Sequence, residues 1–446
     1  MIQALVVTFI ILAILMVDCI VKDERYRATH DMLTGLLNMS AFEVEVRRRI
    51  SERENAAGYY CMICSRIADF KLINKLYGTD VGDKLLSVQA DTIRRLDDGN
   101  SVSARIYADK FCTFLPQKDF NEEEFISVMS KAMKNILPNS LKSHFYLGVY
   151  EINDVSEPVW TMCDKAMMAI DSIRGSYGQY VCYYYDDMLQ RIIREKEVID
   201  GFDRAMDEEQ FNMFLQPQIA NDGTLVGAEA LVRWNHPDKG MISPKLFIPT
   251  LEKACLIHRL DLYMLERVAQ KLEKWKKEGK DHLSISVNIS TKDFYFLDIC
   301  DVFRSLMKKY DFSIKNLKLE ITESALMKNV RNVMQNLNEL HELGYDIEID
   351  DFGSGYSSLG MLKDIKADIL KIDMIFLQEI PYRERSTTIL KNIISMSKEL
   401  GMPVITEGVE TKEQVDFLTN VGCDMFQGFY FAKPMSVENF ETVYAL

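Results

Sequence analysis

The C-terminal half of the chain repeats short strand-like runs, with helix-like segments between most of them. Eight runs fall within about 240 residues, and β-branched and other apolar side chains dominate them. Parallel strands need long connections, usually helices, so this spacing predicts an α/β fold that closes into a TIM-like (β/α)8 barrel over residues 210–446. The runs are Phe211–Ile219, Val226–Trp234, Leu283–Ile289, Leu317–Thr322, Asp346–Asp351, Ile369–Ile372, Pro403–Thr406 and Met425–Phe431.

Polar residues interrupt these runs, within them or at their C-terminal ends, where barrel enzymes build their active sites. They are Glu229, Asn288, Glu320, Glu323, Asp350, Asp351, Lys371, Glu407 and Gln427. Any one of them could be an isolated polar residue with its own partner. Together, the carboxylates would repel one another on one rim, and divalent cations would relieve that repulsion.

The types of ligand in this set indicate which ions would bind. Carboxylate and amide oxygens without His or Cys favour Mg²⁺ or Mn²⁺ over Zn²⁺. Two such ions a few Å apart are a known means of cleaving phosphodiesters. Lys371 could then steady the attacking water or the charge that develops on the phosphate.

At these motifs the C-terminal half resembles the EAL-domain cyclic di-GMP phosphodiesterases. The triplet that names the family is Glu229, Ala230 and Leu231. Ser354 stands where the family usually has Thr, which keeps a hydroxyl group. The other matching motifs are DDFGSGYSSL at 350–359, KID at 371–373, EGVE at 407–410 and QGFYFAKP at 427–434.

The resemblance implies hydrolysis of cyclic di-GMP to linear pGpG with two metal ions, and it implies a role for each matched residue. The metal ligands would be Glu229, Asn288, Glu320, Asp350, Asp351 and Glu407. Lys371, Glu323 and Glu407 would serve catalysis, with Lys371 assisting the attacking water and Glu323 tying down the 350–359 loop. The dinucleotide would be positioned by Gln216, Leu231, Arg233 and Gln427.

Residues 24–188 alternate strands and helices and predict an α/β domain with a mostly antiparallel sheet. They resemble the GGDEF diguanylate cyclase domain through DMLTGLLN at 31–38 and FKLINKLYGTDVGD at 70–83. The defining five residues are here YADKF at 107–111, and the metal-linked carboxylates of the family are replaced by Arg66 and Lys110. The resemblance therefore implies a degenerate GGDEF domain, inactive as a cyclase and regulatory.

Asn74 and Asp83 match the residues with which the cyclase family reads guanine. Ordinary turn and cap roles near two glycines are the alternative interpretation. Because Arg66 and Lys110 bring positive charge, a further hypothesis is that GTP binds this domain without metal.

The first 21 residues are apolar apart from Gln3, Thr8 and Asp18, and basic residues follow at once. This predicts a transmembrane anchor over 1–21 and a single-pass protein of the cytoplasmic membrane, with both domains in the cytoplasm. A secretory signal peptide and a buried helix are the alternatives. Residues 189–209 have a helical period and predict a linker helix.

The formal net charge of −14 argues against binding of a nucleic-acid duplex, which relies on basic surface. The nine cysteines show no disulfide framework, and the C-x-x-C pair Cys61 and Cys64 is expected to pack within a strand. The resemblance also leads us to expect a homodimer. A cyclic di-GMP receptor without turnover and a bifunctional cyclase and phosphodiesterase are the competing functions.

Overall fold

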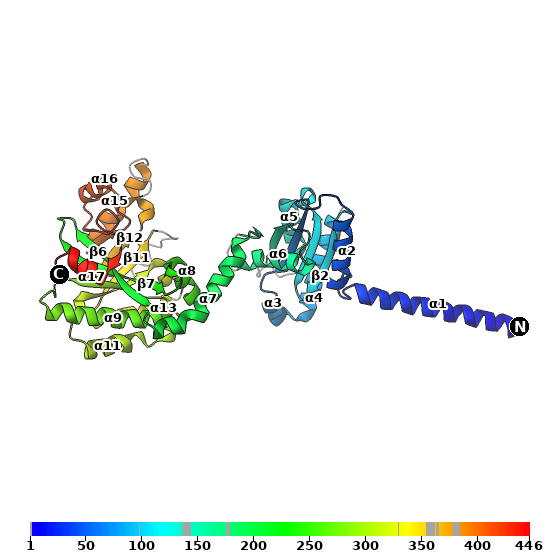
Figure 1. Ribbon diagram of the computed structural model, residues 1–446, viewed down its shortest axis with the longest axis horizontal. Helices are drawn as coiled ribbons and strands as arrows, with labels where there is room; N and C mark the ends of the chain where they lie inside the picture. The colour runs from blue at the N-terminus through cyan, green and yellow to red at the C-terminus, as the bar shows by residue number, and fades with distance from the viewer. Residues whose placement is uncertain are drawn as a thin grey trace. The chain divides into compact units, whose positions relative to one another are not determined.

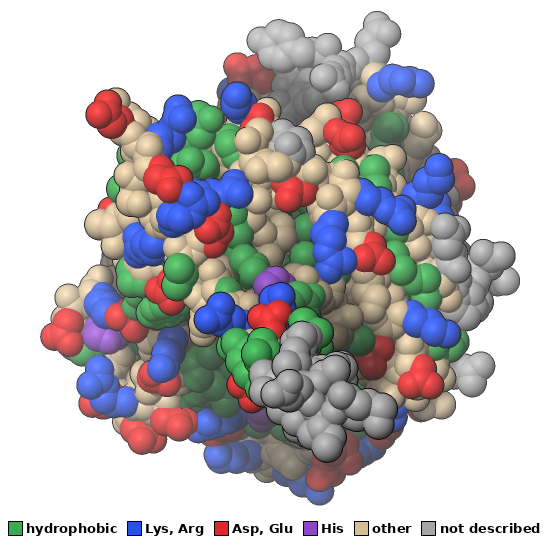
Figure 2. All heavy atoms as spheres, turned by 90° about the vertical axis from the view of Figure 1, so that its right-hand side faces the viewer, with side chains coloured by type: hydrophobic (Ala, Val, Ile, Leu, Met, Phe, Trp, Pro, Cys, Tyr) green, Lys and Arg blue, Asp and Glu red, His purple; other side chains and the backbone are tan. Residues whose placement is uncertain are grey.

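The computed structural model describes residues 2–97, 99–134, 136, 144–174, 179–328, 330–353, 362, 365–377 and 384–446. The chain divides into two compact units, Met1–Ile193 and Arg194–Leu446, which are described separately below. Figure 1 shows the helices and strands of each unit, and Figure 2 shows one face of the molecule, where acidic and basic side chains are interspersed.

The first unit contains a five-stranded sheet in the order β2-β3-β1-β4-β5. Only the β4–β5 pairing is parallel; the other described pairings in this sheet are antiparallel. The predicted α/β domain with a mostly antiparallel sheet is therefore observed. After α1, its elements are α2 (Met39–Ser51), β1 (Tyr60–Ile67), α3 (Phe70–Tyr77), α4 (Thr79–Leu96), β2 (Val102–Tyr107), β3 (Lys110–Pro116), η1 (Gln117–Asp119), α5 (Glu122–Lys134), β4 (Phe145–Glu151), α6 (Val159–Ile173) and β5 (Val181–Tyr183). Helix α7 (Asp187–Asp207) begins in this unit and continues past Ile193 into the second.

Helices cover both faces of this sheet, so its central strand β1 is apolar along most of its length (Figure 1). On one face, α2 and α6 pack through Phe42 and Met162. On the other face, α4 and α5 pack through Leu86 and Met129. Burial on both faces explains why the sequence of β1 lacks the polar alternation of a half-exposed strand.

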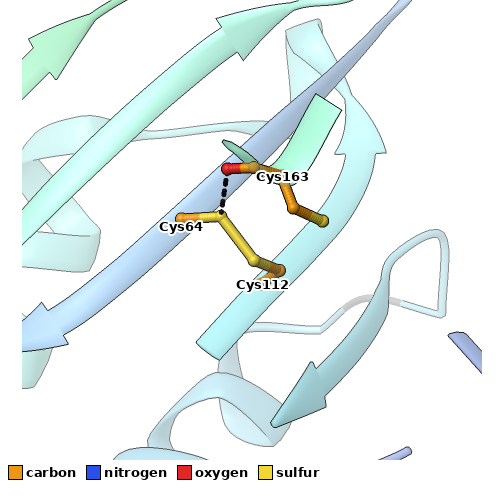
Figure 3. Close-up of side chains that lie close together, drawn as sticks. All are labelled: Cys64, Cys112 and Cys163. Carbon is orange, nitrogen blue, oxygen red and sulfur yellow. Dashed lines mark hydrogen bonds between the residues drawn. A yellow bond between two sulfur atoms is a disulfide. The ribbon is translucent and has the colours of Figure 1, made fainter. Parts of the chain in front are cut away.

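Three buried cysteines lie together where α6 covers β1 and β3 (Figure 3). Cys64 and Cys112 are cross-strand partners in the antiparallel register and form a disulfide. Cys163 of α6 lies beside them, with its carbonyl oxygen 3.5 Å from the Cys64 sulfur. The expectation of no disulfide is wrong at this place, because strand register brings together two residues 48 positions apart in sequence.

Helix α1 spans Ile2–Thr29 and does not end where the apolar run ends. It continues through a charged segment with Lys22–Asp18 and Arg27–Asp23 ion pairs. Over the residues that the structure describes, no helix has a stretch both apolar and long enough to cross a membrane. The prediction of a transmembrane anchor over 1–21, and of a single-pass membrane location with it, is therefore wrong.

The second unit is a closed barrel. Its sheet order is β15-β6-β14-β13-β12-β11-β10-β9-β7-β8, and an added β6–β7 pairing closes the ring. The elements are β6 (Phe211–Ala220), β7 (Leu225–His236), β8 (Gly240–Ile242), α8 (Pro244–Lys253), α9 (Ile257–Lys277), β9 (Ser284–Asn288), α10 (Asp293–Phe296), α11 (Ile299–Lys309), η2 (Ile314–Asn316), β10 (Leu317–Thr322), α12 (Glu323–Lys328), α13 (Val330–Glu342), β11 (Asp346–Phe352), β12 (Ile369–Ile372), η3 (Met374–Phe376), α15 (Glu384–Glu399), β13 (Val404–Thr406), α16 (Lys412–Asn420), β14 (Met425–Phe426), β15 (Met435–Ser436) and α17 (Val437–Val443).

The first strand of the barrel departs from the all-parallel arrangement of a TIM barrel. Strand β6 is antiparallel to both β7 and β14, whereas the ring pairings from β7 through β9 to β14 are parallel. A tight turn around Asp222 and Gly223 joins β6 to β7, and so short a connection allows only an antiparallel pair.

Side chains along each barrel strand alternate between two environments. In β10, Leu319 and Ile321 belong to the apolar cluster shared with the surrounding helices. Lys318 precedes Leu319, and Glu320 lies between Leu319 and Ile321, so both face the interior of the barrel. This period of two decides which polar residues of a strand can reach the interior.

Candidate active site

Lys371 lies at the centre of a group of carboxylates inside the barrel. It is fully buried on β12. Its Nζ contacts side chains on the three strands β7, β10 and β11, and the side chain of the residue that follows β13. The distances are 2.6 Å to Glu407 Oε1, 3.0 Å to Glu320 Oε1, 3.2 Å to Asp350 Oδ1 and 3.7 Å to Glu229 Oε2. One ammonium group thus contacts four carboxyl groups, so its single positive charge cannot neutralise all four when they are ionised.

Amide side chains fix the orientation of Glu229. Asn288, the last residue of β9, donates from Nδ2 to Glu229 Oε1 at 2.9 Å. Gln427, directly after β14, donates from Nε2 to Glu229 Oε2 at 2.5 Å and to Gln216 Oε1 at 3.3 Å. Residues from four strands or strand ends therefore meet at one carboxylate.

Asp350 and Asp351 lie on adjacent positions of β11 where the strand register shifts before Phe352. Asp351 has a φ of +55°, in the left-handed region that Asp tolerates better than most residues. The irregularity turns consecutive carboxylates toward one place. Oxygen atoms of Asp350, Asp351 and Glu407 all lie within 4.8 Å of one another, close enough to hold one metal ion.

The pKa values of this group reflect burial first and mutual repulsion second. Burial, then neighbouring charges including those of Asp350 and Glu229, raises the pKa of Glu407 to about 8, with Lys371 opposing the rise. Burial and then Asp350 raise the pKa of Asp351 to about 6. Burial and then Glu229 raise the pKa of Glu320 well above its ordinary value. Lys371 opposes the rise at all three groups but does not cancel it.

The donor set fits divalent cations. Apart from their ion pairs with Lys371, both carboxylate oxygens of Glu320 and Oδ1 of Asp350 are buried and accept no hydrogen bond from the described part of the chain. All the surrounding ligand atoms are oxygen, which suits Mg²⁺ or Mn²⁺. The residues predicted from the sequence as metal ligands are thus brought together, while their metal-binding role stays a prediction.

Glu323 is the first residue of α12, and only a small part of it is exposed. Its Oε2 accepts a hydrogen bond from the Gly353 backbone N–H at 3.0 Å, which ties the end of β11 to β10. This contact is the one that its expected loop-holding role requires. Ser354 and the rest of the motif up to residue 359 lie outside the described residues.

A cavity of about 350 Å³ opens beside Glu229 and Asn288. Leu231 and Arg233 line it, and their role in positioning a substrate stays a prediction. The Arg233 guanidinium is half-buried, and burial lowers its pKa. Gln216 is absent from the lining but reaches the site through its hydrogen bond with Gln427.

Two features of the barrel were missed by reasoning from the sequence. Asp261, on the cavity wall, interacts electrostatically with the buried Asp293, and burial raises the pKa of Asp293 to about 6. Lys318 and the fully buried Glu348 form an ion pair at 3.5 Å. The period of two that places Glu320 and Asp350 inside the barrel could have revealed the second pair.

In the first unit, Arg66 occupies the place where the cyclase resemblance has a metal carboxylate. Its Nε donates to Asp109 Oδ2 at 3.0 Å, and its Nη1 lies 3.8 Å from Asp171 Oδ1. Ala108 has a φ of +50°, a conformation that favours glycine, and Tyr107 beside it is exposed. Arg66 thus has two acidic partners within the protein.

The two predicted guanine readers lie on consecutive helices of this unit. Asn74 is on α3 and Asp83 is on α4. Asn74 lies directly over Gly82, since a Cβ there would meet its Oδ1 at 1.9 Å. Packing therefore accounts for Gly82, and guanine reading by Asn74 and Asp83 stays a prediction.

Family models match most of the chain. A model described as the EAL domain matches residues 200–434, which is more than half of the chain. The chain belongs to the EAL domain family. A second model, described as the diguanylate cyclase GGDEF domain, matches residues 28–170, so the predicted tandem of the two domains is confirmed.

Curated relatives match nearly the whole chain. Cyclic di-GMP phosphodiesterase NbdA of Pseudomonas aeruginosa is 31% identical over 423 residues, covering 94% of this chain and 54% of that protein. Cyclic di-GMP phosphodiesterase PdeR of Escherichia coli is 29% identical over 437 residues, covering 94% of this chain and 64% of that protein. The chain therefore spans between half and two thirds of the length of these relatives.

Solved structures agree with the barrel. The phosphodiesterase PaMucR in complex with c-di-GMP is 34% identical, with a TM-score of 0.53, and covers 55% of this chain and 99% of that chain. The c-di-GMP-bound S helix, GGDEF and EAL portion of Vibrio cholerae LapD is 20% identical, with a TM-score of 0.53, and covers 92% of this chain and 98% of that chain. The LapD likeness concerns the fold only.

Proposed function

We propose that the EAL barrel hydrolyses cyclic di-GMP to linear pGpG with two divalent cations, Mg²⁺ or Mn²⁺, and so lowers the level of this second messenger. The observation that carries the proposal is the group of four carboxylates around the buried Lys371. The similarity to NbdA and PdeR, both named cyclic di-GMP phosphodiesterases, and to PaMucR in complex with c-di-GMP supports the choice of substrate.

Charge balance supports two cations rather than one. Ionised Glu229, Glu320, Asp350, Asp351 and Glu407 carry five negative charges, and the Lys371 ammonium group offsets one of them. Two divalent ions would neutralise the remaining four. The ions would be held by these carboxylates and by Asn288, and they would polarise the scissile phosphate and activate water.

The side chains of the chain itself would orient the reactants. Asn288 and Gln427 hold Glu229 in one rotamer, so a ligand that it provides is preorganised. Lys371 would hold the attacking water against the phosphorus, and Arg233 would contact a phosphate from the cavity wall. The water oxygen joins phosphorus, one ribose oxygen leaves, and that oxygen takes up a proton, which opens the ring.

We also propose that the GGDEF domain is inactive as a cyclase and is regulatory. Arg66 and Lys110 replace metal-linked carboxylates, and the Arg66 charge is already engaged by Asp109 and Asp171. The same ion pairs weaken the hypothesis that Arg66 is available to a GTP phosphate. Binding of GTP and homodimer formation both stay predictions.

Substitution of two ligands on different strands tests the phosphodiesterase proposal. Glu229→Ala and Asp350→Ala should each lower turnover of cyclic di-GMP by at least about a hundredfold, the loss expected when electrostatic stabilisation of the transition state is removed. The measurement is the initial rate in excess Mg²⁺ on the full chain. Turnover at the wild-type rate in either variant would show that the site is assigned wrongly.

A further inference from the structure

A charged pair lies inside the barrel, next to the carboxylates of the active site. Lys318 Nζ is 3.5 Å from Glu348 Oε1, and Glu348 is fully buried. Barrel interiors are usually filled by layers of Val, Ile and Leu. A buried pair of opposite charges is costly to desolvate, so its presence at this position needs a physical reason.

The strand register places this pair against the active site. Glu348 on β11 is the in-register parallel neighbour of Glu320 on β10. The alternating positions Leu319 and Ile347 belong to the outer apolar cluster, so Glu320 and Glu348 both face the interior. Two carboxylates therefore lie side by side, both fully buried, and no described residue donates a hydrogen bond to either.

Each of these carboxylates has a lysine of its own. Lys371 is 3.0 Å from Glu320, and Lys318 is 3.5 Å from Glu348. Without Lys318, the nearest positive charges for Glu348 would be Lys371 and any cation bound at the neighbouring Glu320. Glu348 would then compete with Glu320 for the charges that the active site uses.

We propose that Lys318 is a positioning residue, which engages Glu348 beside the active site and so keeps that carboxylate from acting as an extra ligand. The inference rests on the proposed function, since it assumes that cations bind at Glu320 and its neighbours. Glu348 in turn neutralises Lys318, whose charge would otherwise repel those cations. The two residues act as one neutral unit that sets the strength and geometry of cation binding.

The test compares Lys318→Met, Glu348→Gln and the double variant in the full chain. Calorimetry measures Mn²⁺ affinity without substrate, and initial rates give kcat and KM in Mg²⁺. Glu348→Gln should weaken Mn²⁺ binding about tenfold or more, because an unpaired lysine then repels the ion. Lys318→Met should lower kcat about tenfold or more with little change in KM, because Glu348 distorts the ligand set.

The double variant should recover to within about threefold of wild type in both measurements, since it removes a neutral unit. A purely structural role would instead give losses that add. The matched control is Lys315→Met, which breaks a pair between the exposed Lys315 of η2, just before β10, and Asp346 at the start of β11, and should change neither measurement.

The outcomes separate this inference from the proposed function. The proposed role of the Lys318–Glu348 pair is overturned if the single variants have the Mn²⁺ affinity and kcat of an active wild type. It is also overturned if the losses in the double variant equal the two single losses combined. A wild type that binds Mn²⁺ but does not hydrolyse cyclic di-GMP contradicts the proposed activity. The Mn²⁺ affinities of the variants still test the proposed role of the Lys318–Glu348 pair. If Lys318→Met does not fold, the comparison of Glu348→Gln with the double variant decides it. A wild type that binds no Mn²⁺ overturns both.

Discussion

Replacement of Lys371 by Met tests the electrostatics of the site most severely. The substitution keeps the length of the side chain and removes one buried positive charge that contacts Glu229, Glu320, Asp350 and Glu407. Without added metal, these carboxylates then lose their common cation. We expect the metal-free protein to lose stability and the metal-loaded protein to lose much less.

The size of the effect follows from burial. Removing one partner of a buried ion pair costs about 3–5 kcal/mol. For a unit of this size, Arg194–Leu446, each kcal/mol shifts the melting temperature by roughly 2–4 °C, so a fall of roughly 6–20 °C is expected. Saturating Mg²⁺ should recover most of that fall, because divalent ions supply the charge that Lys371 no longer provides.

The assay is thermal unfolding of the full chain in EDTA and in Mg²⁺, with turnover measured on the same samples. Turnover should fall at least about a hundredfold even where Mg²⁺ restores stability. Lys398→Met is the control, since Lys398 forms a loose, half-exposed pair with Asp424 and should matter little. A Lys371→Met protein that melts with the wild type in EDTA would refute the reasoning.

Three further predictions concern other parts of the molecule. No cyclic di-GMP should form from GTP in a Lys371→Ala background, where breakdown is blocked, because Arg66 and Lys110 replace metal carboxylates; nucleotide chromatography would detect any product. Ca²⁺ should inhibit hydrolysis, since it prefers more ligands at longer distances than Mg²⁺, and full rates in Ca²⁺ alone would contradict this. Asp293→Asn should raise the melting temperature more at pH 8 than at pH 5. Burial raises the Asp293 pKa to about 6, so its stabilising contribution is lost as the pH rises through 6; an equal shift at both pH values would count against it.

The sequence was enough to predict the barrel strands, because each is a compact apolar run with a polar residue at a fixed end. Leu317–Thr322 and Ile369–Ile372 agree with the observed strands at both ends. The antiparallel direction of β6 was missed, although the short Asp222–Gly223 turn before β7 carries that information. A connection too short for a crossover helix can join only antiparallel strands, which is why β6 and β7 run in opposite directions.

The site was predicted only as far as strand ends could show it. Glu320 and Asp350 were found because they lie near the ends of their strands, whereas Lys318 and Glu348 lie earlier on the same inward-facing sides. The Arg66–Asp109 ion pair depends on how two strands pair, which the residue types alone do not reveal.

The N-terminal segment was predicted wrongly for a local reason. Its apolar residues were read as a complete element that ends before Lys22. Instead, α1 continues to Thr29 through charged residues with ion pairs one helical turn apart. A helix can pass from apolar to charged sequence without interruption, so composition alone did not set the end of the element.

The most direct test of the central claim is to incubate the purified full chain with cyclic di-GMP in Mg²⁺ and to identify the products by chromatography. The account predicts accumulation of linear pGpG, its loss when EDTA is added, and its return when Mg²⁺ or Mn²⁺ is restored. Binding of cyclic di-GMP without any product in Mg²⁺ or Mn²⁺ would contradict the account and favour a receptor.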